Sequence, residues 1–124
     1  MARAVGSDRP LGWLPWRRLR IYGPSMAPTL RHADVVLVRR TRRARPGDVA
    51  VVRWAARPGQ LSVKRVERST ADLGDRGDLG DRYFVTGDNP DASTDSRDLG
   101  PAAVLGVIRW RLWPRPGRLA PRRL

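Results

Sequence analysis

The stretch GDVAVVRWAARPGQLSVKRVERS, residues 47–69, contains two valine-rich runs on either side of the short segment RPGQ. Pro58 presets its own φ angle and Gly59 permits backbone conformations that other residues avoid, so RPGQ is a turn signal. Valine-rich runs bounded by turns of this kind are typical of β-strands. The stretch therefore predicts two strands, GDVAVVRW and LSVKRVER, joined by a turn.

The same pattern continues on both sides of this stretch. Three further runs of Val, Leu, Ile and aromatic residues are separated by Gly, Pro and Asp: ADVVLVRR (33–40), RYFVTGD (82–88) and AAVLGVIRWRLW (102–113). No segment of ten or more residues has the period of an amphipathic helix, and no apolar run approaches the ~20 residues that span a bilayer. We therefore expect a mainly β domain of short antiparallel strands without a transmembrane helix.

The 124 residues fit a single domain. Residues 1–18 mix Arg, Gly and Pro with two tryptophans and predict a basic N-terminal arm. The folded domain is expected over 19–113, with a Gly/Asp-rich surface loop at 71–82 (ADLGDRGDLGDR) and an Arg/Pro-rich tail at 114–124.

Composition restricts the chemistry of the chain. There is no cysteine, which excludes disulfides, thiolate metal sites and cysteine nucleophiles, and the single histidine, His32, limits metal and histidine-base chemistry. We expect no metal or organic cofactor. The net charge of +13 favours anionic partners, either nucleic acid or an anionic membrane surface. The N-terminus lacks the apolar core of a secretory signal, so a cytoplasmic location is expected.

One lysine stands among the basic residues. The chain has 25 basic residues, and all but Lys64 are arginine. Lysine can lose its proton inside a protein, whereas arginine effectively cannot. Lys64 lies between Val63 and Arg65 on an expected strand, and apolar surroundings would lower its pKa by desolvation. Lys64 is either a functional base or an ordinary surface lysine.

The segment GPSMAPTL, residues 23–30, places Ser25 between a proline and a methionine. A serine nucleophile needs a nearby base and donors for the developing oxyanion. The glycine and prolines favour a tight bend that would expose the hydroxyl and direct backbone N–H groups outward. The same residues also suit a plain turn before a strand.

A third segment, TGDNPDASTDSRDLGP (86–101), concentrates the residue types that form side chain to backbone hydrogen bonds. Within it, Asp95 and Arg97 could form an ion pair that fixes the loop, and Ser93 could orient a neutral lysine amine. Taken alone, this segment predicts a polar loop.

Together the three segments resemble the type I signal peptidase family, serine proteases with a Ser-Lys dyad. GPSMAPTL followed by ADVVLV is similar to the nucleophile box of that family, VKRV to its lysine box, and GDNPDASTDSR..GP to its last box. The three occur in the family's order between Leu19 and about Trp113. The resemblance implies a signal-peptidase-like catalytic β domain that cleaves protein substrates.

The resemblance also implies roles for individual residues. Ser25 would be the nucleophile, with its backbone N–H in the oxyanion hole, and Lys64 the general base. Ser93 would hydrogen-bond the lysine. The other residues expected at the site are Gly23, Pro24 and Met26 for oxyanion and substrate binding, and Asp95, Arg97, Gly87, Asp88 and Asn89 for support.

The chain departs from the family pattern in three places. Some members carry a serine hydroxyl as a second oxyanion donor two residues before the nucleophile, where this chain has Gly23. Ala33 and Asp34 stand where the family usually has Gly-Asp. Well-known bacterial members carry one or two N-terminal membrane helices, which are not expected here.

A short, anchorless relative with these motifs looks most like the nickel-type superoxide dismutase maturation proteases. These remove an N-terminal propeptide, so the expected partner is the precursor of such a dismutase.

Three alternatives stay open. The first is a signal peptidase that docks on a membrane surface through Trp13, Trp16 and flanking arginines and cleaves exported preproteins. The second is a self-cleaving repressor, although no DNA-binding domain precedes Ser25. The third is a non-catalytic, basic nucleic-acid-binding β module.

Overall fold

The described part of the chain consists almost entirely of antiparallel β-strands. The structure is a computed structural model that describes residues 3–5, 15–70, 76–77 and 80–119. Its elements are β1 (Arg3–Val5), β2 (Trp16–Tyr22), β3 (Val35–Arg40), β4 (Val49–Arg53), β5 (Ser62–Ser69), β6 (Arg76–Gly77), β7 (Gly80–Thr86), the 3₁₀ helix η2 (Pro90–Ala92), α1 (Ser96–Leu99), β8 (Ala102–Trp113) and β9 (Gly117–Arg118).

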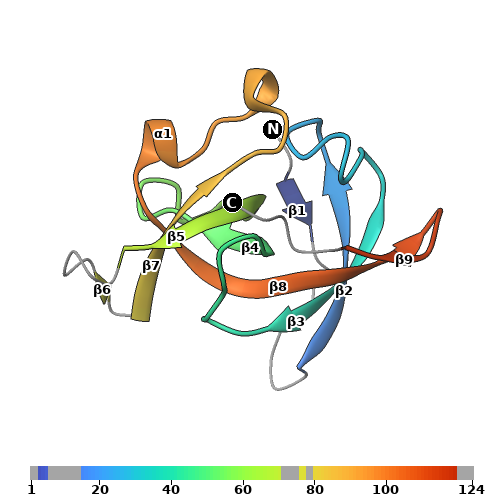
Figure 1. Cartoon of the computed structure of the whole chain (residues 1–124), viewed down its shortest axis with the longest axis horizontal. Helices are drawn as coiled ribbons and strands as arrows, with labels where there is room; N and C mark the ends of the chain where they lie inside the picture. Colours follow the sequence, from blue (N-terminus) through green and yellow to red (C-terminus); the bar gives the residue numbers. More distant parts are fainter. Residues whose placement is uncertain (1–2, 6–14, 71–75, 78–79, 120–124) are drawn as a thin grey trace.

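The strands follow the order β1-β2-β3-β8-β4-β5-β7-β6, and β9 pairs with β8. Two additional pairings, β1 with β5 and β7 with β8, close this sheet on itself twice. Strands β4, β5 and β8 belong to both closed circuits, and β8 crosses the molecule between β3 and β4 (Figure 1). One closed circuit lies on each side of these three strands. Side chains on both of their faces can therefore be buried.

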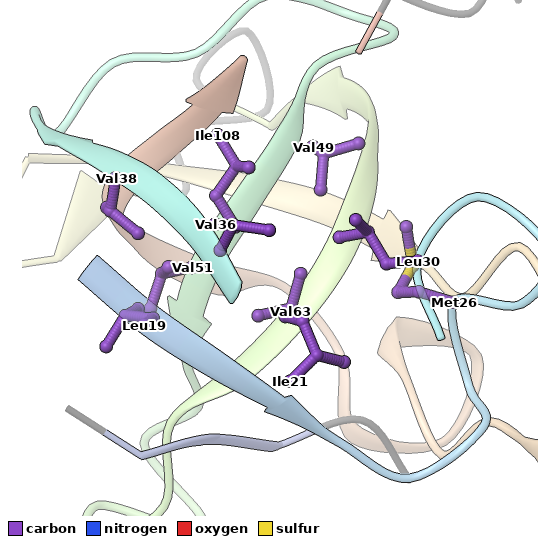
Figure 2. Close-up of a cluster of buried hydrophobic side chains, with 10 residues drawn as sticks. All are labelled: Leu19, Ile21, Met26, Leu30, Val36, Val38, Val49, Val51, Val63 and Ile108. Atoms are coloured by element: carbon purple, nitrogen blue, oxygen red, sulfur yellow. The ribbon is translucent and has the colours of Figure 1, made fainter. Parts of the chain in front are cut away.

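Two hydrophobic clusters fill the two circuits. The first is lined by β2, β3, β4, β5 and β8 (Figure 2) and contains Leu19, Ile21, Met26, Leu30, Val36, Val38, Val49, Val51, Val63 and Ile108. The second contains Ala50, Val52, Trp54, Val66, Tyr83, Val85, Ala102 and Val104. Alternate residues of β4 enter different clusters, as the period of two in a strand requires.

The expected mainly β, antiparallel fold is confirmed, and all five predicted runs form strands. The turn at 57–60 is present, with the Gln60 N–H donating to the Arg57 carbonyl at 3.1 Å. In the part of the chain that the structure describes, no helix is long and apolar enough to cross a membrane.

The segments expected outside the domain contribute strands to the sheet. Parts of the expected arm form β1 and the start of β2, and part of the expected tail forms β9. Within the expected loop at 71–82, β6 and the first residues of β7 form a two-stranded pairing. The remainder of these segments, including Trp13, lies outside the described residues.

Candidate active site

Ser25 lies in the turn that connects β2 to β3. The turn begins at Gly23, whose φ of +85° lies in the left-handed region that favours glycine. Inside the turn, the Leu30 N–H donates to the Met26 carbonyl at 2.9 Å. The side chains of Met26 and Leu30 are fully buried in the first cluster. The packing of these two side chains in the hydrophobic core therefore fixes the position of the turn.

The segment that follows β7 holds the same turn from the other side. The Asn89 N–H donates to the Ser25 carbonyl at 2.9 Å, and Asn89 Nδ2 donates to the Pro24 carbonyl at 3.2 Å. Gly87 is packed so closely that a Cβ atom there would lie 2.6 Å from the Ser25 carbonyl oxygen and 2.6 Å from Ser93 Cβ. Any larger residue at position 87 would therefore push the turn that contains Ser25 away from the segment that contains Gly87 and Ser93.

Lys64 is a completely buried lysine on β5, with no exposed surface. Its Nζ donates a hydrogen bond to Ser93 Oγ at 2.8 Å. Burial lowers the pKa of Lys64 from 10.5 to about 8, because desolvation disfavours the ammonium form. The negative charge of Asp95 opposes this shift, and the positive charge of Arg97 adds to it. Near pH 7 about one tenth of Lys64 is therefore a neutral amine, compared with fewer than about one in a thousand for an ordinary lysine.

Asp95 organises the polar side of the site. Its Oδ2 accepts hydrogen bonds from Ser93 Oγ at 2.9 Å and from the Gly87 N–H at 3.0 Å. Its Oδ1 accepts from Arg97 Nε at 2.9 Å, as one contact of an ion pair. Burial alone would raise the pKa of Asp95, but these hydrogen bonds outweigh burial and lower it. Asp95, ionised at neutral pH, thus fixes the Ser93 hydroxyl that accepts the hydrogen bond from Lys64.

Arg65, the next residue on β5, makes a different set of contacts. Its guanidinium pairs with Asp88 at 2.7 Å, and both side chains are almost fully buried. Arg65 also donates to the Gly47 carbonyl at 2.8 Å. Asp88 accepts a further, short hydrogen bond from Thr29 Oγ1, in the turn that contains Ser25. The pair joins β5, the β7–β8 connection and the serine turn.

The residues expected to bind the oxyanion are arranged differently from the expectation. The Gly23 N–H already donates to His32 Nδ1 at 3.0 Å, so this group is not available to a substrate. Pro24 has no N–H, and the side chain of Met26 is buried in the core. In this structure Gly23, Pro24 and Met26 shape the turn, and their expected part in oxyanion and substrate binding stays a prediction. The expected part of Ser25 in the oxyanion hole, through its backbone N–H, likewise stays a prediction.

The structure brings the other expected residues into one connected group. Gly87 lies against both Ser25 and Ser93, and Ser93 joins Lys64 to Asp95 and Arg97. The contacts that join Ser25 to this group run through its backbone carbonyl, whereas Lys64 Nζ contacts Ser93 Oγ. Among the described residues there is no group of three or more His, Cys, Asp or Glu side chains that could hold a metal ion.

Two residues of this network were not assigned from the sequence. Arg65 follows Lys64 directly, and alternation in a strand places its side chain on the opposite face, but the sequence does not show that its partner is Asp88. The sequence uses His32 only as a limit on metal and histidine-base chemistry, and it has no signal for the hydrogen bond from Gly23 to His32. Both contacts join residues that come together only in the folded chain.

Comparison with known proteins identifies the class of this domain. Residues 17–74 match the family described as Peptidase S24-like. The chain is 30% identical over 118 residues to the mitochondrial ATP-independent inner membrane protease subunit 1b of Arabidopsis thaliana, with 75% of this chain and 68% of that protein covered. It is 34% identical over 110 residues to the mitochondrial inner membrane protease subunit 1 of Xenopus tropicalis, with 74% and 66% covered.

Proposed function

This chain belongs to the Peptidase S24-like and signal peptidase family of serine peptidases, and we propose that it cuts a protein precursor with Ser25 as nucleophile and Lys64 as general base. Family membership decides for a peptidase over a non-catalytic basic module. The observation that carries the proposal for the dyad is the buried Lys64 amine, hydrogen-bonded to Ser93 and with a pKa of about 8.

The proposed chemistry has two stages. In the first, neutral Lys64 takes the proton from Ser25 Oγ as the oxygen attacks the scissile carbonyl carbon, and the resulting ammonium then protonates the leaving amine. In the second, Lys64 takes a proton from a water molecule that attacks the acyl-enzyme ester, and Ser25 Oγ regains its proton. Ser93 and Asp95 keep the amine oriented through both stages.

Substrate access imposes a condition on this mechanism. Ser25 has no exposed surface in the structure. A substrate carbonyl can reach its hydroxyl only after the residues over it move aside. The developing oxyanion would be stabilised by the Ser25 backbone N–H, because Gly23 offers neither a side-chain hydroxyl nor an available N–H.

For the substrate, we favour the N-terminal propeptide of a nickel-type superoxide dismutase precursor. The support is the resemblance of GPSM and GDNPDASTDSR..GP to the short maturation proteases that remove such propeptides. This substrate would be met in the cytoplasm.

A second candidate is a signal peptidase for exported preproteins. The names of the relatives favour it, since both of the proteins compared are inner membrane proteases. This substrate would be met at a membrane surface, so fractionation of cells into cytosol and membranes would separate the two candidates.

The test is to incubate the purified chain separately with a nickel dismutase precursor and with an exported preprotein, and to read new N-termini by mass spectrometry. We expect one defined cut that removes the N-terminal segment of one precursor and is absent with the Ser25→Ala variant. Equal cleavage by Ser25→Ala, or failure to cut either precursor, would contradict the proposal.

A further inference from the structure

A pocket of about 330 Å³ lies beside the turn that contains Ser25. Three segments form its walls: Pro28 of that turn, the next turn (Arg31–Asp34), and the end of β8 with residues 114–115. None of the residues that line it belongs to the group around Lys64 and Ser93. Pockets that bind small molecules begin at about 300 Å³, so this volume suits a small ligand.

His32 lines this pocket, and the Gly23 backbone fixes its tautomer. The Gly23 N–H donates to His32 Nδ1 at 3.0 Å, so Nδ1 carries no proton. The proton of the neutral imidazole is then on Nε2, which makes Nε2 a hydrogen-bond donor. His32 therefore brings an N–H donor, and no acceptor, to a ligand in the pocket.

Three arginines, Arg31, Arg111 and Arg115, bring guanidinium groups to the same pocket. Arg111 is 26% exposed, and two backbone carbonyls hold its side chain. Its Nε donates to the Arg115 carbonyl at 2.8 Å, and its Nη1 donates to the Thr29 carbonyl at 3.2 Å. Its Nη2 makes no hydrogen bond to the described residues. A guanidinium that is fixed in place and keeps N–H groups for a ligand suits an oxyanion.

Asp34 supplies the one carboxylate among the described residues that line the pocket. Its Oδ2 accepts from the Arg31 backbone N–H at 2.9 Å and lies 3.9 Å from Arg111 Nη1, too far for a hydrogen bond. Three guanidinium groups and one carboxylate leave a net charge of +2, which complements a dianion. Pro28 and Pro114 add apolar surface beside these charges.

We propose that this pocket binds a phosphate group, as the free ion or on a small molecule, through Arg31, Arg111 and Arg115. Guanidinium groups match phosphate oxygens in both charge and geometry. The binding goes beyond the proposed peptidase chemistry and needs neither Ser25 nor Lys64. The Ser25→Ala variant should therefore bind phosphate like the unmodified chain, whether or not the unmodified chain cleaves a precursor.

The test is titration of the full chain at constant pH with inorganic phosphate and with glycerol 3-phosphate. His32 is the only histidine, so its single imidazole signal in NMR reports on the pocket. We expect both phosphates to shift this signal in a saturable way, and acetate at the same ionic strength to bind at least about tenfold more weakly. Tighter binding of glycerol 3-phosphate would identify a phosphate monoester as the ligand, and equal binding would identify the free ion. Both results support the proposal.

The variant Arg31→Gln/Arg115→Gln should bind phosphate at least about tenfold more weakly, because it loses hydrogen bonds to a charged group. The two side chains form no hydrogen bond or ion pair with the described residues, so the fold should stay intact, which circular dichroism checks. The matched control, Arg43→Gln/Arg57→Gln, removes the same charge from exposed loop positions. It should keep the affinity within about twofold.

Three results would overturn the proposal. Equal losses in the pocket variant and the control would show that only net charge matters. A His32 signal that phosphate leaves unmoved would show that phosphate does not enter the pocket. Acetate that binds as tightly as phosphate would show that the pocket does not select a dianion.

Discussion

Lys64 and Arg65 are consecutive cations on β5, and both are buried, yet their surroundings differ completely. Arg65 is neutralised by a direct ion pair with Asp88 and donates to a carbonyl as well. Lys64 has a hydroxyl as its hydrogen-bond partner, and its pKa falls to about 8. A paired buried cation holds a structure together, whereas a buried lysine without a carboxylate in contact is ready to lose its proton.

The largest expected effect separates these two residues by activity. Lys64→Met removes the amine and should lower kcat/KM for precursor cleavage by at least about 1,000-fold, the scale of a general base. Arg65→Met leaves Ser25 and Lys64 in place and should retain far more activity under conditions where it is folded. The measurement is initial cleavage rate at 10 °C for both variants. Comparable losses of cleavage activity in the two variants would contradict the distinction between Lys64 as the general base and Arg65 as a structural ion-pair partner.

Stability should change in opposite directions. Arg65→Met removes the ion-pair partner of the buried Asp88 carboxylate, which should cost about 3 kcal/mol of unfolding free energy. Lys64→Met removes a buried charge. A pKa lowered from 10.5 to about 8 corresponds to a cost of about 3 kcal/mol at neutral pH, so this variant should be more stable by up to that amount.

The sign of the pH dependence follows from the same shift. Between pH 8 and 10.5 the unfolded chain keeps the Lys64 proton that the folded chain has lost, so the stability of the unmodified protein rises with pH there. The advantage of Lys64→Met should therefore shrink across this window. Urea unfolding at several pH values measures this difference in unfolding free energy. A Lys64→Met variant that is less stable than the unmodified protein at pH 7 would contradict the expected cost of burying the Lys64 charge.

The next effect concerns Gly87. It lies on the Lys64 side of β5, packed against Ser25 and Ser93, whereas the next residue, Asp88, pairs with Arg65. Gly87→Ala should separate the serine turn from Ser93 and cost about 1 to 3 kcal/mol of stability, with a loss of activity larger than the unfolding explains. Gly59→Ala is the control, because nothing lies within 4 Å of a Cβ there. Thermal melting and cleavage rates compare them, and similar behaviour of the two variants would show that the close packing at Gly87 is not needed.

The smallest expected effect concerns Ala33, which belongs neither to the group around Lys64 and Ser93 nor to the Arg65–Asp88 pair. Ala33 has a φ of +75°, a conformation that favours glycine. Ala33→Gly should stabilise the fold by about 0.5 to 1 kcal/mol after the extra freedom of the unfolded chain is counted, with activity unchanged. Ala56→Gly, in an exposed turn, should not stabilise. Chemical unfolding of both tests this, and a destabilised Ala33→Gly would contradict it.

The interior of the fold could be predicted because its strands carry a strong local pattern. The runs around Val49, Val63 and Val104 are valine-rich on both faces and bounded by Gly, Pro and Asp. β2 was not predicted, since its outer face carries Trp16, Arg18 and Arg20 and resembles a basic arm. The pairing of β1 with β5 joins segments about 60 residues apart, and no local pattern indicates it.

The candidate site could be predicted at the level of residue types and less well at the level of contacts. Ser25, Lys64 and Ser93 were found because a lone lysine, a serine turn and a hydroxyl-rich loop are visible in the sequence. The Gly23 contact with His32 was not visible, because a backbone N–H has no signature in a sequence. The same holds for the burial of Met26, which follows from the way the turn folds over the core.

The central claim, that Lys64 is the base, can be tested on one resonance. Lys64 is the only lysine in the chain, so labelling lysine with ¹³C at Cε gives a single side-chain signal that can be titrated by NMR. We predict a midpoint near 8, in place of the ordinary 10.5, with a fold that stays intact through the titration. A midpoint close to 10.5 would contradict the assignment of Lys64 as the base.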